Sequence, residues 1–276
     1  MSYQIVRSSA SAQHIKLYSK LLSNVFKNPS KFTEEYLSWL YAQNPNGTLV
    51  GTDAFFEGEL VAHYATIPIS YTFFGQRVRG LLAINNVTHP EHQHKGLFLK
   101  LGTETMEEAK RLGYEFVFAV TNNNSTYGYL NKFDFTRIAP LDVKIGCGVM
   151  VPSKAHANVF SNWDDACIRW RFQSPKTPYF RHNRSVYSKT EIIGLNAQII
   201  SCNVNSINEL DLAEHRSVFT MWIGLSNTLK RKGLFVDMPD RVKPSPLNLL
   251  YRDLTGNLPI FSKDDLVFEL ADFDAY

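Results

Sequence analysis

The feature that most constrains the fold of this chain is a series of three strand-like runs with almost nothing between them. Residues 48–56, 60–73 and 77–88 are rich in β-branched and aromatic side chains, which favour strands. Only Glu57-Gly58-Glu59 and Phe74-Gly75-Gln76 separate these runs, and connections of this length are typical of β-hairpins. The sequence therefore predicts a three-stranded antiparallel meander.

Helical patterns flank this meander. Apolar residues at helical spacing and end signals at proline or glycine define four helices, and a nearly all-apolar run indicates a strand buried on both faces. These elements are a helix from Ser11 to Asn28-Pro29, a helix from Thr33 to the turn at 44–47, a helix over 97–112, a buried strand over 114–120 and a helix near 125–133. The second half predicts strands near 190–203, 233–238 and 264–270 and a helix near 208–231.

The composition suits one large domain or two closely packed smaller ones. The chain has 276 residues, 44% of them hydrophobic, and its formal net charge of only +3 argues against nucleic acid as a partner. Its cysteines, Cys147, Cys167 and Cys202, are far apart, so neither a disulfide framework nor a metal site is predicted. Neither a signal-peptide pattern nor an apolar run of membrane-spanning length occurs in the sequence, and we expect a cytoplasmic location.

A glycine-containing turn joins the third strand-like run to the long helix. The first amides of a helix have no partner within it, and with the helix dipole they form a natural anion site. Gly96 would let a phosphate approach the backbone closely, and His94 and Lys95 would add positive charge at the rim. One glycine in such a turn is also an ordinary structural feature, so this signal alone leaves both interpretations open.

The wider run from Val87 to Leu101 resembles motif A of the GNAT acyltransferase superfamily. In that motif a strand and a proline-containing turn lead to Arg/Gln-x-x-Gly-x-Gly/Ala at the start of a helix. Gln93 and Gly96 match its first two signature positions, and Phe98 replaces the final small residue. The order of predicted elements over roughly residues 1–140 is also similar to that of the superfamily.

This resemblance implies an α/β (α+β) fold, with a central, mostly antiparallel sheet flanked by helices, and an acyl-CoA thioester as the donor. The pyrophosphate of the coenzyme would lie on the amides of the turn, and its pantetheine arm would extend along the third run like an added strand. The residues implied in coenzyme binding are Asn86, Val87, Thr88, Gln93, His94, Lys95, Gly96, Leu97, Phe98 and Asn124.

The catalytic groups follow less directly from the resemblance. At the position of the tyrosine that often serves as the acid in this superfamily, the chain has Leu130. Tyr127 and Tyr129 are nearby substitutes, and Tyr127 is preferred. His63 has a suitable side chain for the base, and Asn85 could orient the nucleophile or a water. Core packing explains Tyr127 and His63 equally simply, and a transferase that relies on proximity and an oxyanion hole needs no strong base.

The second half contains a basic and aromatic segment beginning at Arg169. It resembles a Trp-Arg…Pro…Tyr segment of GNAT proteins of surface-polysaccharide synthesis, in which a degenerate GNAT-like half follows the coenzyme-binding one. The resemblance divides the chain into an acyl-CoA-binding domain, 1–140, and an acceptor-binding region, 141–276. Arginines suit a diphosphate and aromatic rings suit a base or sugar, so the predicted acceptor-binding residues are Arg169, Trp170, Arg171, Tyr179 and Arg181. The alternative is that the arginines are simply exposed to solvent and the tryptophans pack in the core between the two halves.

The resemblance implies an N-acyltransferase for a nucleotide-linked amino sugar, of the dTDP-3-amino-3,6-dideoxyhexose type, in O-antigen or lipopolysaccharide biosynthesis. The acyl group could be acetyl or a 3-hydroxyacyl group such as 3-hydroxybutyryl, and an oligomer is possible. Two alternatives remain: a GNAT enzyme that acts on a polyamine, a lysine or an antibiotic amine, and a non-catalytic acyl-CoA sensor. The basic character of the segment at 169–184 favours an anionic acceptor over a cationic one.

Overall fold

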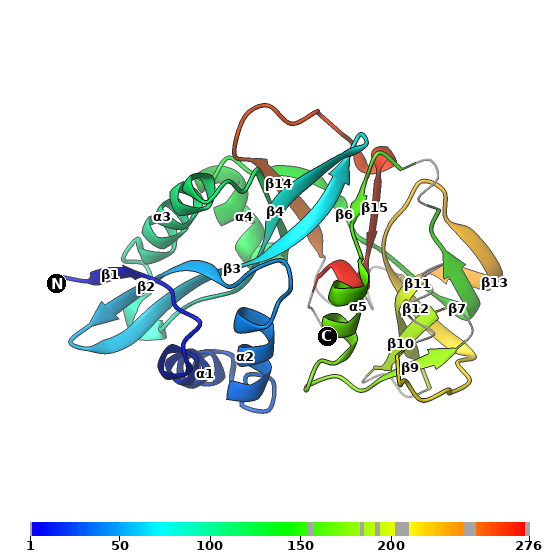
Figure 1. The fold of residues 1–276 in the computed structure, drawn as a ribbon, viewed down its shortest axis with the longest axis horizontal. Coiled ribbons are helices and arrows are strands. Elements are labelled where there is room, and N and C mark those ends of the chain that lie inside the picture. The colour runs from blue at the N-terminus through cyan, green and yellow to red at the C-terminus, as the bar shows by residue number, and fades with distance from the viewer. Residues whose placement is uncertain are drawn as a thin grey trace.

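A computed structural model describes residues 2–153, 157–182, 185–190, 194–201, 210–239 and 247–273. The amino-terminal half begins with a short strand that the sequence did not predict and then follows the predicted order (Figure 1). Its elements are β1 (Gln4–Arg7), α1 (Ala12–Phe26), α2 (Glu34–Ala42), β2 (Val50–Phe56), β3 (Glu59–Phe73), β4 (Gln76–Thr88), the 3-10 turn Pro90–His92, α3 (Leu97–Arg111), β5 (Phe116–Thr121), α4 (Asn123–Lys132) and β6 (Thr136–Pro140).

The predicted meander of β2, β3 and β4 is confirmed, and both of its hairpins are antiparallel. Each hairpin turns through two residues with positive φ: Glu57 at 51° and Gly58 at 84°, then Phe74 at 47° and Gly75 at 84°. Two such residues in succession form the turn whose twist matches that of the flanking strands. The two-residue turns, each with glycine as the second residue, therefore determine that consecutive strands pair as hairpins.

A strand from the second half completes the first sheet. β14 (Asn248–Asp253) lies between β5 and β6 and pairs with both in antiparallel fashion (Figure 1). The regions 1–140 and 141–276 are thus interleaved in space, since β14 belongs to the second by sequence and to the first by pairing. The sheet of the amino-terminal half is complete only when residues 248–253 are in place.

The remaining strands form a second, curved part of the same sheet system. Its elements are β7 (Asp142–Val151), β8 (Val159–Ser161), α5 (Asp165–Phe172), β9 (Tyr179–His182), β10 (Ser185–Lys189), β11 (Asn196–Ser201), β12 (Phe219–Leu225), β13 (Lys230–Asp237) and β15 (Leu266–Glu269). β8 pairs with β3, which joins the two parts. Most pairs in the molecule are antiparallel, and β4 with β5, β8 with β15 and β11 with β12 are parallel.

The predicted helix near 208–231 is wrong. Within its described part, residues 219–225 form the strand β12, which is buried over Thr220–Leu225 and lies between β7 and β11. A run of apolar and β-branched residues without helical spacing fits a central strand covered on both faces. The strands predicted near 190–203, 233–238 and 264–270 correspond to β11, β13 and β15.

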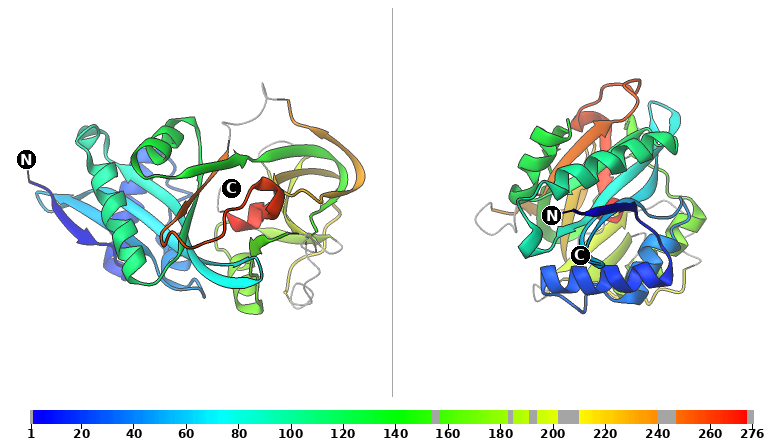
Figure 2. Two further views of the ribbon diagram at one scale, coloured as in Figure 1. Left: turned by 90° about the horizontal axis from the view of Figure 1, so that it is seen from above. Right: turned by 90° about the vertical axis from the view of Figure 1, so that its left-hand side faces the viewer.

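Helices cover both faces of the first sheet. α1 and α2 pack in one apolar cluster around Tyr18, Leu22 and Leu40, and α3 packs in another around Leu101 and Met106, on the opposite side (Figure 2, right). The sheet therefore separates the α2 side from the α3 side.

The two halves of the chain meet where α2 contacts α5. Trp39 and Trp170 stack with ring centroids 4.7 Å apart, and each indole N–H donates to the backbone carbonyl of the other residue. Each indole N–H therefore has an acceptor, and the paired contact fixes α5 against α2.

No helix among the described residues is long and apolar enough to cross a membrane.

We predict that Gly102→Ala destabilises the protein although alanine favours helices. A Cβ at Gly102 would lie 2.3 Å from the Phe133 ring and 2.9 Å from the Tyr64 ring, and both rings are fully buried. Overpacking of this kind costs about 1–3 kcal/mol, against a gain in helix propensity of about 1 kcal/mol. Urea unfolding should show a net loss, whereas Thr103→Ala, on the exposed face of the same helix, should be neutral or slightly stabilising. Equal stability of the two variants would contradict this packing.

Candidate active site

β4 and β5 separate from one another at the centre of the first sheet. They pair in parallel only from Gly80 with Phe116 to Ala83 with Ala119, and no described strand occupies the β5 side of residues 84–88. A bulge marks the separation, because the register of β3 with β4 shifts there and Asn85 has φ of 51°. Residues 84–88 therefore have unpaired backbone on their β5 side, and coenzyme binding by Asn86, Val87 and Thr88 stays a prediction.

Asn86 holds the bulge open with both ends of its side chain. Its Oδ1 accepts a hydrogen bond from the backbone N–H of Ala65 at 2.6 Å, in place of a strand carbonyl. Its Nδ2 donates to the hydroxyl oxygen of Tyr129 at 2.6 Å, which ties β4 to α4. The side chain thus substitutes for the strand pairing that the bulge removes.

A chain of buried polar groups extends from Asp53 to Asn85. The carboxylate of Asp53 accepts from Tyr18 at 2.7 Å and lies 2.6 Å from Nδ1 of His63. Nε2 of His63 lies 3.4 Å from the hydroxyl of Tyr41, which also accepts from Nδ2 of Asn85 at 3.0 Å. The network therefore orients the side chain of Asn85 from inside the core.

His63 itself does not reach the surface of the site. Only 1% of it is exposed, and its ring is sandwiched against Tyr18 at a centroid distance of 4.0 Å. Its sequence-based role as a base in contact with substrate does not match this position, because any contact with a ligand passes through Tyr41 and Asn85. Sequence analysis identified His63 and Asn85 but missed Asp53 and Tyr41, since the three contacts that join these four residues connect positions 10, 22 and 44 apart in the sequence.

The two tyrosines of α4 face in different directions. Tyr127, the preferred acid, is 68% exposed, whereas Tyr129 is 3% exposed and contacts Asn86 at the bulge. Burial raises the pKa of Tyr129 to about 12, although hydrogen bonds from Tyr64 and Asn86 oppose this shift. Because Asn86 donates to the Tyr129 oxygen, the phenolic proton remains available for another acceptor.

The glycine-containing turn has the geometry of an anion site. His94 and Gly96 have φ of 59° and 76°, and the first helical bond is from the N–H of Lys100 to the carbonyl of Gly96. The amides of Leu97 to Leu99 therefore have no acceptor within α3. A Cβ at Gly96 would meet no atom within 4 Å, so the space in front of the turn is open. The hollow at this turn is lined by Ser2, Tyr3, Lys95, Gly96, Leu97 and Lys100.

Two predicted coenzyme-binding residues have structural roles in this region. The amide of Gln93 donates to the carbonyl of Thr88 at 3.2 Å and so closes the turn after β4. Phe98 packs on Tyr64, Tyr129 and Phe133, and Gly128 makes room for its ring. The side chain at this third signature position therefore fills the space between α3 and α4. Asn124 lies in the first turn of α4, and its side chain is outside the described part of the structure.

The structure separates the predicted acceptor-binding residues. Trp170 stacks on Trp39, and Arg171 is 4% exposed and donates to the carbonyl of Phe273. Tyr179 packs edge-on against Phe172, Arg181 lies 2.8 Å from the carboxylate of Glu214, and Arg169 is on the exposed face of α5. Only Trp170 and Arg171 line the cavity between the two halves.

That cavity has a volume of about 40 Å³, room for one or two water molecules. Its polar lining comes from several segments, among them the loop after α2, the strand β3, the end of β8 with the residue after it, and the carboxy-terminal segment. These residues include Asn44, Asn46, Ser70, Asn162 and Asp272.

Sequence analysis missed an unusual cation on the α2 side. The Nζ atom of Lys176 is buried, has no hydrogen-bond partner in the described part of the chain and lies 5.1 Å from the ring centre of Tyr36. Burial, together with the nearby positive charges of Lys31 and Arg171, lowers the pKa of Lys176 to about 8. A buried ammonium beside two other cations favours an anion as its partner.

Comparison with known proteins identifies the amino-terminal half. Residues 7–138 match the family model of the acetyltransferase (GNAT) domain. No curated protein matches the chain in sequence.

Several solved structures share the fold of almost the whole chain. A probable N-acyltransferase from Enterococcus faecalis V583 has a TM-score of 0.58 at 8% identity, covering 92% of this chain and 73% of that one. A GCN5-related N-acetyltransferase from Anabaena variabilis has a TM-score of 0.58 at 11% identity, covering 92% and 74%. A protein from Pyrococcus horikoshii assigned as an acetyltransferase has a TM-score of 0.56 at 9% identity, covering 97% and 94%.

At these identities the solved structures establish the fold alone, and the match to the family model covers the segment that carries the bulge and the anion turn. GNAT domains use acyl-CoA as a co-substrate and act on an amine-bearing acceptor. Residues 7–138 are therefore an acetyltransferase domain of the GNAT superfamily, and the chain that carries them is an acyltransferase.

Proposed function

We propose that this acyltransferase moves an acyl group from acyl-CoA to the amine of a nucleotide-linked amino sugar, of the dTDP-3-amino-3,6-dideoxyhexose type used in surface-polysaccharide biosynthesis. The observation that carries the proposal is Lys176, a buried ammonium with no hydrogen-bond partner among the described residues and with two further cations nearby. A diphosphate would satisfy it through charge-assisted hydrogen bonds. A polyamine or a lysine side chain would add to the repulsion.

The position of Lys176 relative to the bulge supports this choice. Tyr36, which contacts Lys176, and Tyr41, which contacts Asn85, both belong to α2. They lie about 7–8 Å apart along the helix axis. An acceptor with its anionic group near Lys176 and its amine near Asn85 would span a sugar and the adjacent phosphate. Residues 141–276, which supply Lys176, act in this proposal as the acceptor-binding region.

In the proposed reaction the coenzyme binds on the opposite side of the same strand. Its diphosphate would lie on the free amides at the start of α3, between Lys95 and Lys100, and its pantetheine arm along residues 86–88. The free backbone of β4 would polarise the thioester carbonyl. The acyl group is acetyl or a 3-hydroxyacyl group such as 3-hydroxybutyryl.

The chemical step needs an uncharged amine and a protonated leaving group. The amine nitrogen attacks the thioester carbon, the C–S bond breaks, and the thiolate takes the proton of Tyr129, which the solvent replaces. Asn85 donates through Nδ2 to Tyr41, so its Oδ1 is left to accept from the attacking amine. The proton lost from nitrogen passes to water. His63 acts as a positioning residue, because it holds Tyr41 in the orientation that Asn85 needs.

We predict that Gly96→Glu abolishes CoA binding and leaves the protein folded. The new carboxylate would occupy the open space in front of the free amides and repel the diphosphate. Gly75→Glu is a matched control, because Gly75 has φ of 84°, close to the 76° of Gly96, and its Cβ position is also open. Calorimetric titration with CoA should show binding to the wild type and to Gly75→Glu only. Unchanged affinity in Gly96→Glu would rule out the assigned coenzyme site.

We predict that Tyr129→Phe lowers kcat by about 100-fold, as expected for loss of a general acid. Tyr127→Phe should keep the wild-type rate, since this side chain is 68% exposed. Because the pKa of Tyr129 is raised to about 12, its proton is present below about pH 11, and the rate should not fall there through this group. Steady-state rates of thiol release against pH would measure both effects. Similar rates for the two variants would exclude Tyr129 as the acid.

We predict that thiol release occurs with a nucleotide-linked amino sugar. Acetyl-CoA and 3-hydroxybutyryl-CoA would each be offered with dTDP- and UDP-amino sugars, polyamines, lysine peptides and an aminoglycoside. Lys176→Met should raise the KM for the sugar nucleotide by about tenfold, the effect of one charge-assisted hydrogen bond, without changing CoA binding. Lys20→Met, an exposed residue that pairs with Glu59, is the control. Turnover confined to polyamines or peptides would overturn the proposed acceptor.

The role of Lys176 as a buried cation can also be tested by measuring protein stability against pH. The pKa of Lys176 is about 8 in the folded protein and 10.5 is its ordinary value, so the unfolded chain binds more protons between these pH values. The free energy of unfolding contributed by this group therefore rises as pH increases from about 8 to 10.5. Lys176→Met should be more stable than the wild type at neutral pH and should lack this rise.

A further inference from the structure

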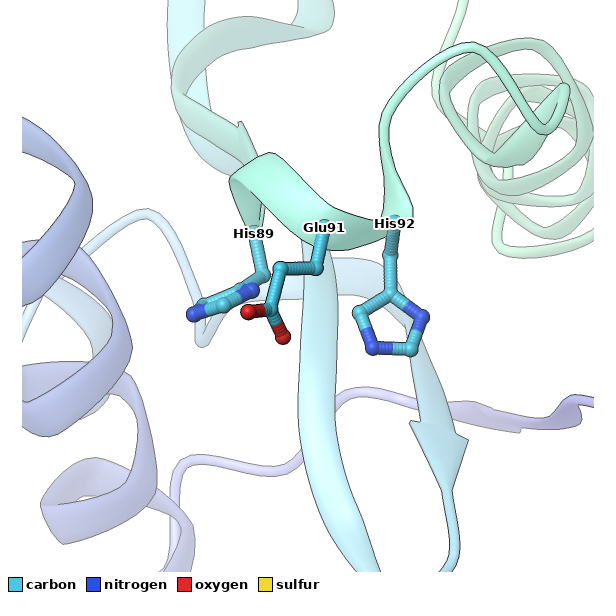
Figure 3. A group of neighbouring side chains, drawn as sticks. All are labelled: His89, Glu91 and His92. Atoms are coloured by element: carbon cyan, nitrogen blue, oxygen red, sulfur yellow. The ribbon is translucent and has the colours of Figure 1, made fainter.

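A group of three side chains in the turn between β4 and α3 has no part in the proposed reaction. His89, Glu91 and His92 project from the same side of the 3-10 turn Pro90–His92, over the strands beneath it (Figure 3). Pro90 occupies the first position of this turn, where its fixed φ suits the helical backbone. Residues three apart are aligned in a 3-10 helix, which brings the two imidazoles to one side.

The three side chains form a compact set of donors. One ligand atom from each residue lies within 4.8 Å of those of the other two. Ligands around a tetrahedral zinc ion lie about 3.3 Å apart, from bonds of about 2.0–2.1 Å, so small side-chain rotations would bring the set into coordination. Two imidazoles and one carboxylate with an open position are a donor set for zinc and other divalent transition metals.

Two of these groups have no other partner. Nδ1 of His89 is buried and makes no hydrogen bond. The carboxylate of Glu91 forms no ion pair or hydrogen bond with any described residue, although Lys95 is close enough to donate to the backbone carbonyl of Glu91 at 2.8 Å. A buried nitrogen without a partner is unfavourable, and a metal ion would satisfy it.

The third group is already oriented. Nδ1 of His92 lies 3.0 Å from the hydroxyl of Tyr3. Histidine ligands commonly donate their other ring N–H to an oxygen, which fixes the ring and the tautomer. With Nδ1–H donating to Tyr3, Nε2 of His92 carries the lone pair that faces a metal.

We propose that His89, Glu91 and His92 form a binding site for a divalent transition-metal ion of the zinc type, with water in the remaining position. Sequence analysis predicted no metal site from the widely spaced cysteines, and ligands at positions i, i+2 and i+3 of a single turn match none of the usual zinc spacings. The site is next to the coenzyme turn, and Tyr3 belongs to both, since it also lines the hollow at the start of α3.

Cobalt(II) is a suitable probe, because its visible absorption reports ligand type and geometry. Untagged, metal-free protein would be titrated with Co²⁺, and then with Zn²⁺ in competition. We expect one ion per chain, an absorption band of a four- or five-coordinate site and displacement of Co²⁺ by Zn²⁺. Glu91→Gln and His92→Gln should each weaken binding by 100-fold or more, while Tyr3→Phe should weaken it by about tenfold, the effect of an outer hydrogen bond.

His94→Gln is the matched control for metal binding. His94 is exposed and two residues beyond His92, and it is not part of the donor set. Its removal should leave the Co²⁺ spectrum and affinity unchanged. Absence of the absorption band in the wild type, or equal loss of affinity in His94→Gln and His92→Gln, would overturn the site. Circular dichroism of Glu91→Gln, an exposed isosteric change, separates loss of the ion from loss of the fold.

The ion would also place positive charge beside the hollow, a consequence that rests on the proposed coenzyme site. CoA should then bind several-fold more tightly to the zinc-loaded protein, and Glu91→Gln should abolish the difference. Metal binding is measured without CoA, so the outcome for the metal site is independent of the coenzyme assignment. Equal CoA affinity with and without zinc would exclude coupling between the two.

Discussion

The bulge at Asn85 and Asn86 is the constraint on which the rest of the site depends. A non-glycine residue with φ of 51° costs about 1–3 kcal/mol and persists only when its surroundings hold it. Three side-chain hydrogen bonds supply that restraint: Asn86 accepts from the backbone of Ala65 and donates to Tyr129, and Asn85 donates to Tyr41. The strain is thus held by β3, α4 and α2 together, and it directs residues 84–88 away from β5. Without the bulge, pairing with β5 could continue and leave no free backbone for a coenzyme.

The buried pair of Asp53 and His63 extends this constraint into the core. A buried carboxylate without partners would be strongly unfavourable. Asp53 has three: it accepts hydrogen bonds from Ser8 and Tyr18, and it faces His63. These partners come from the segment before α1, from α1 itself and from β3. A network that joins three elements fixes their relative positions more narrowly than apolar packing alone would. Its outer end is Tyr41, so the packing of α1 is coupled through hydrogen bonds to the side chain of Asn85.

Short sequence signals predicted those parts of the fold that depend on neighbouring residues only. The meander follows from two short loops with Gly58 and Gly75, and the anion turn follows from Gly96. Long-range pairing could not be predicted: β14 joins β5 across more than a hundred residues of sequence, and β12 is apolar without the spacing of a helix. The different surroundings of Tyr127 and Tyr129 could not be predicted for a related reason. Positions two apart on a helix face nearly opposite directions, and only the placement of α4 on the sheet decides which one meets β4.

Two groups of cations lie on opposite faces of the first sheet. Lys95 and Lys100 border the hollow at the start of α3, whereas Lys31, Arg171 and Lys176 gather near α2. Two anionic substrates bound in one cleft would repel each other. If they bind on opposite sides of β4, their anionic groups stay apart and only the thioester and the amine come together. With this division, a chain with a net charge of only +3 could provide the two anion sites of the proposed reaction, since elsewhere its cations are balanced by acids. In the proposed reaction the acceptor site would have its own cation, Lys176, and because the pKa of Lys176 is lowered to about 8, anion binding there would depend on pH independently of the coenzyme turn.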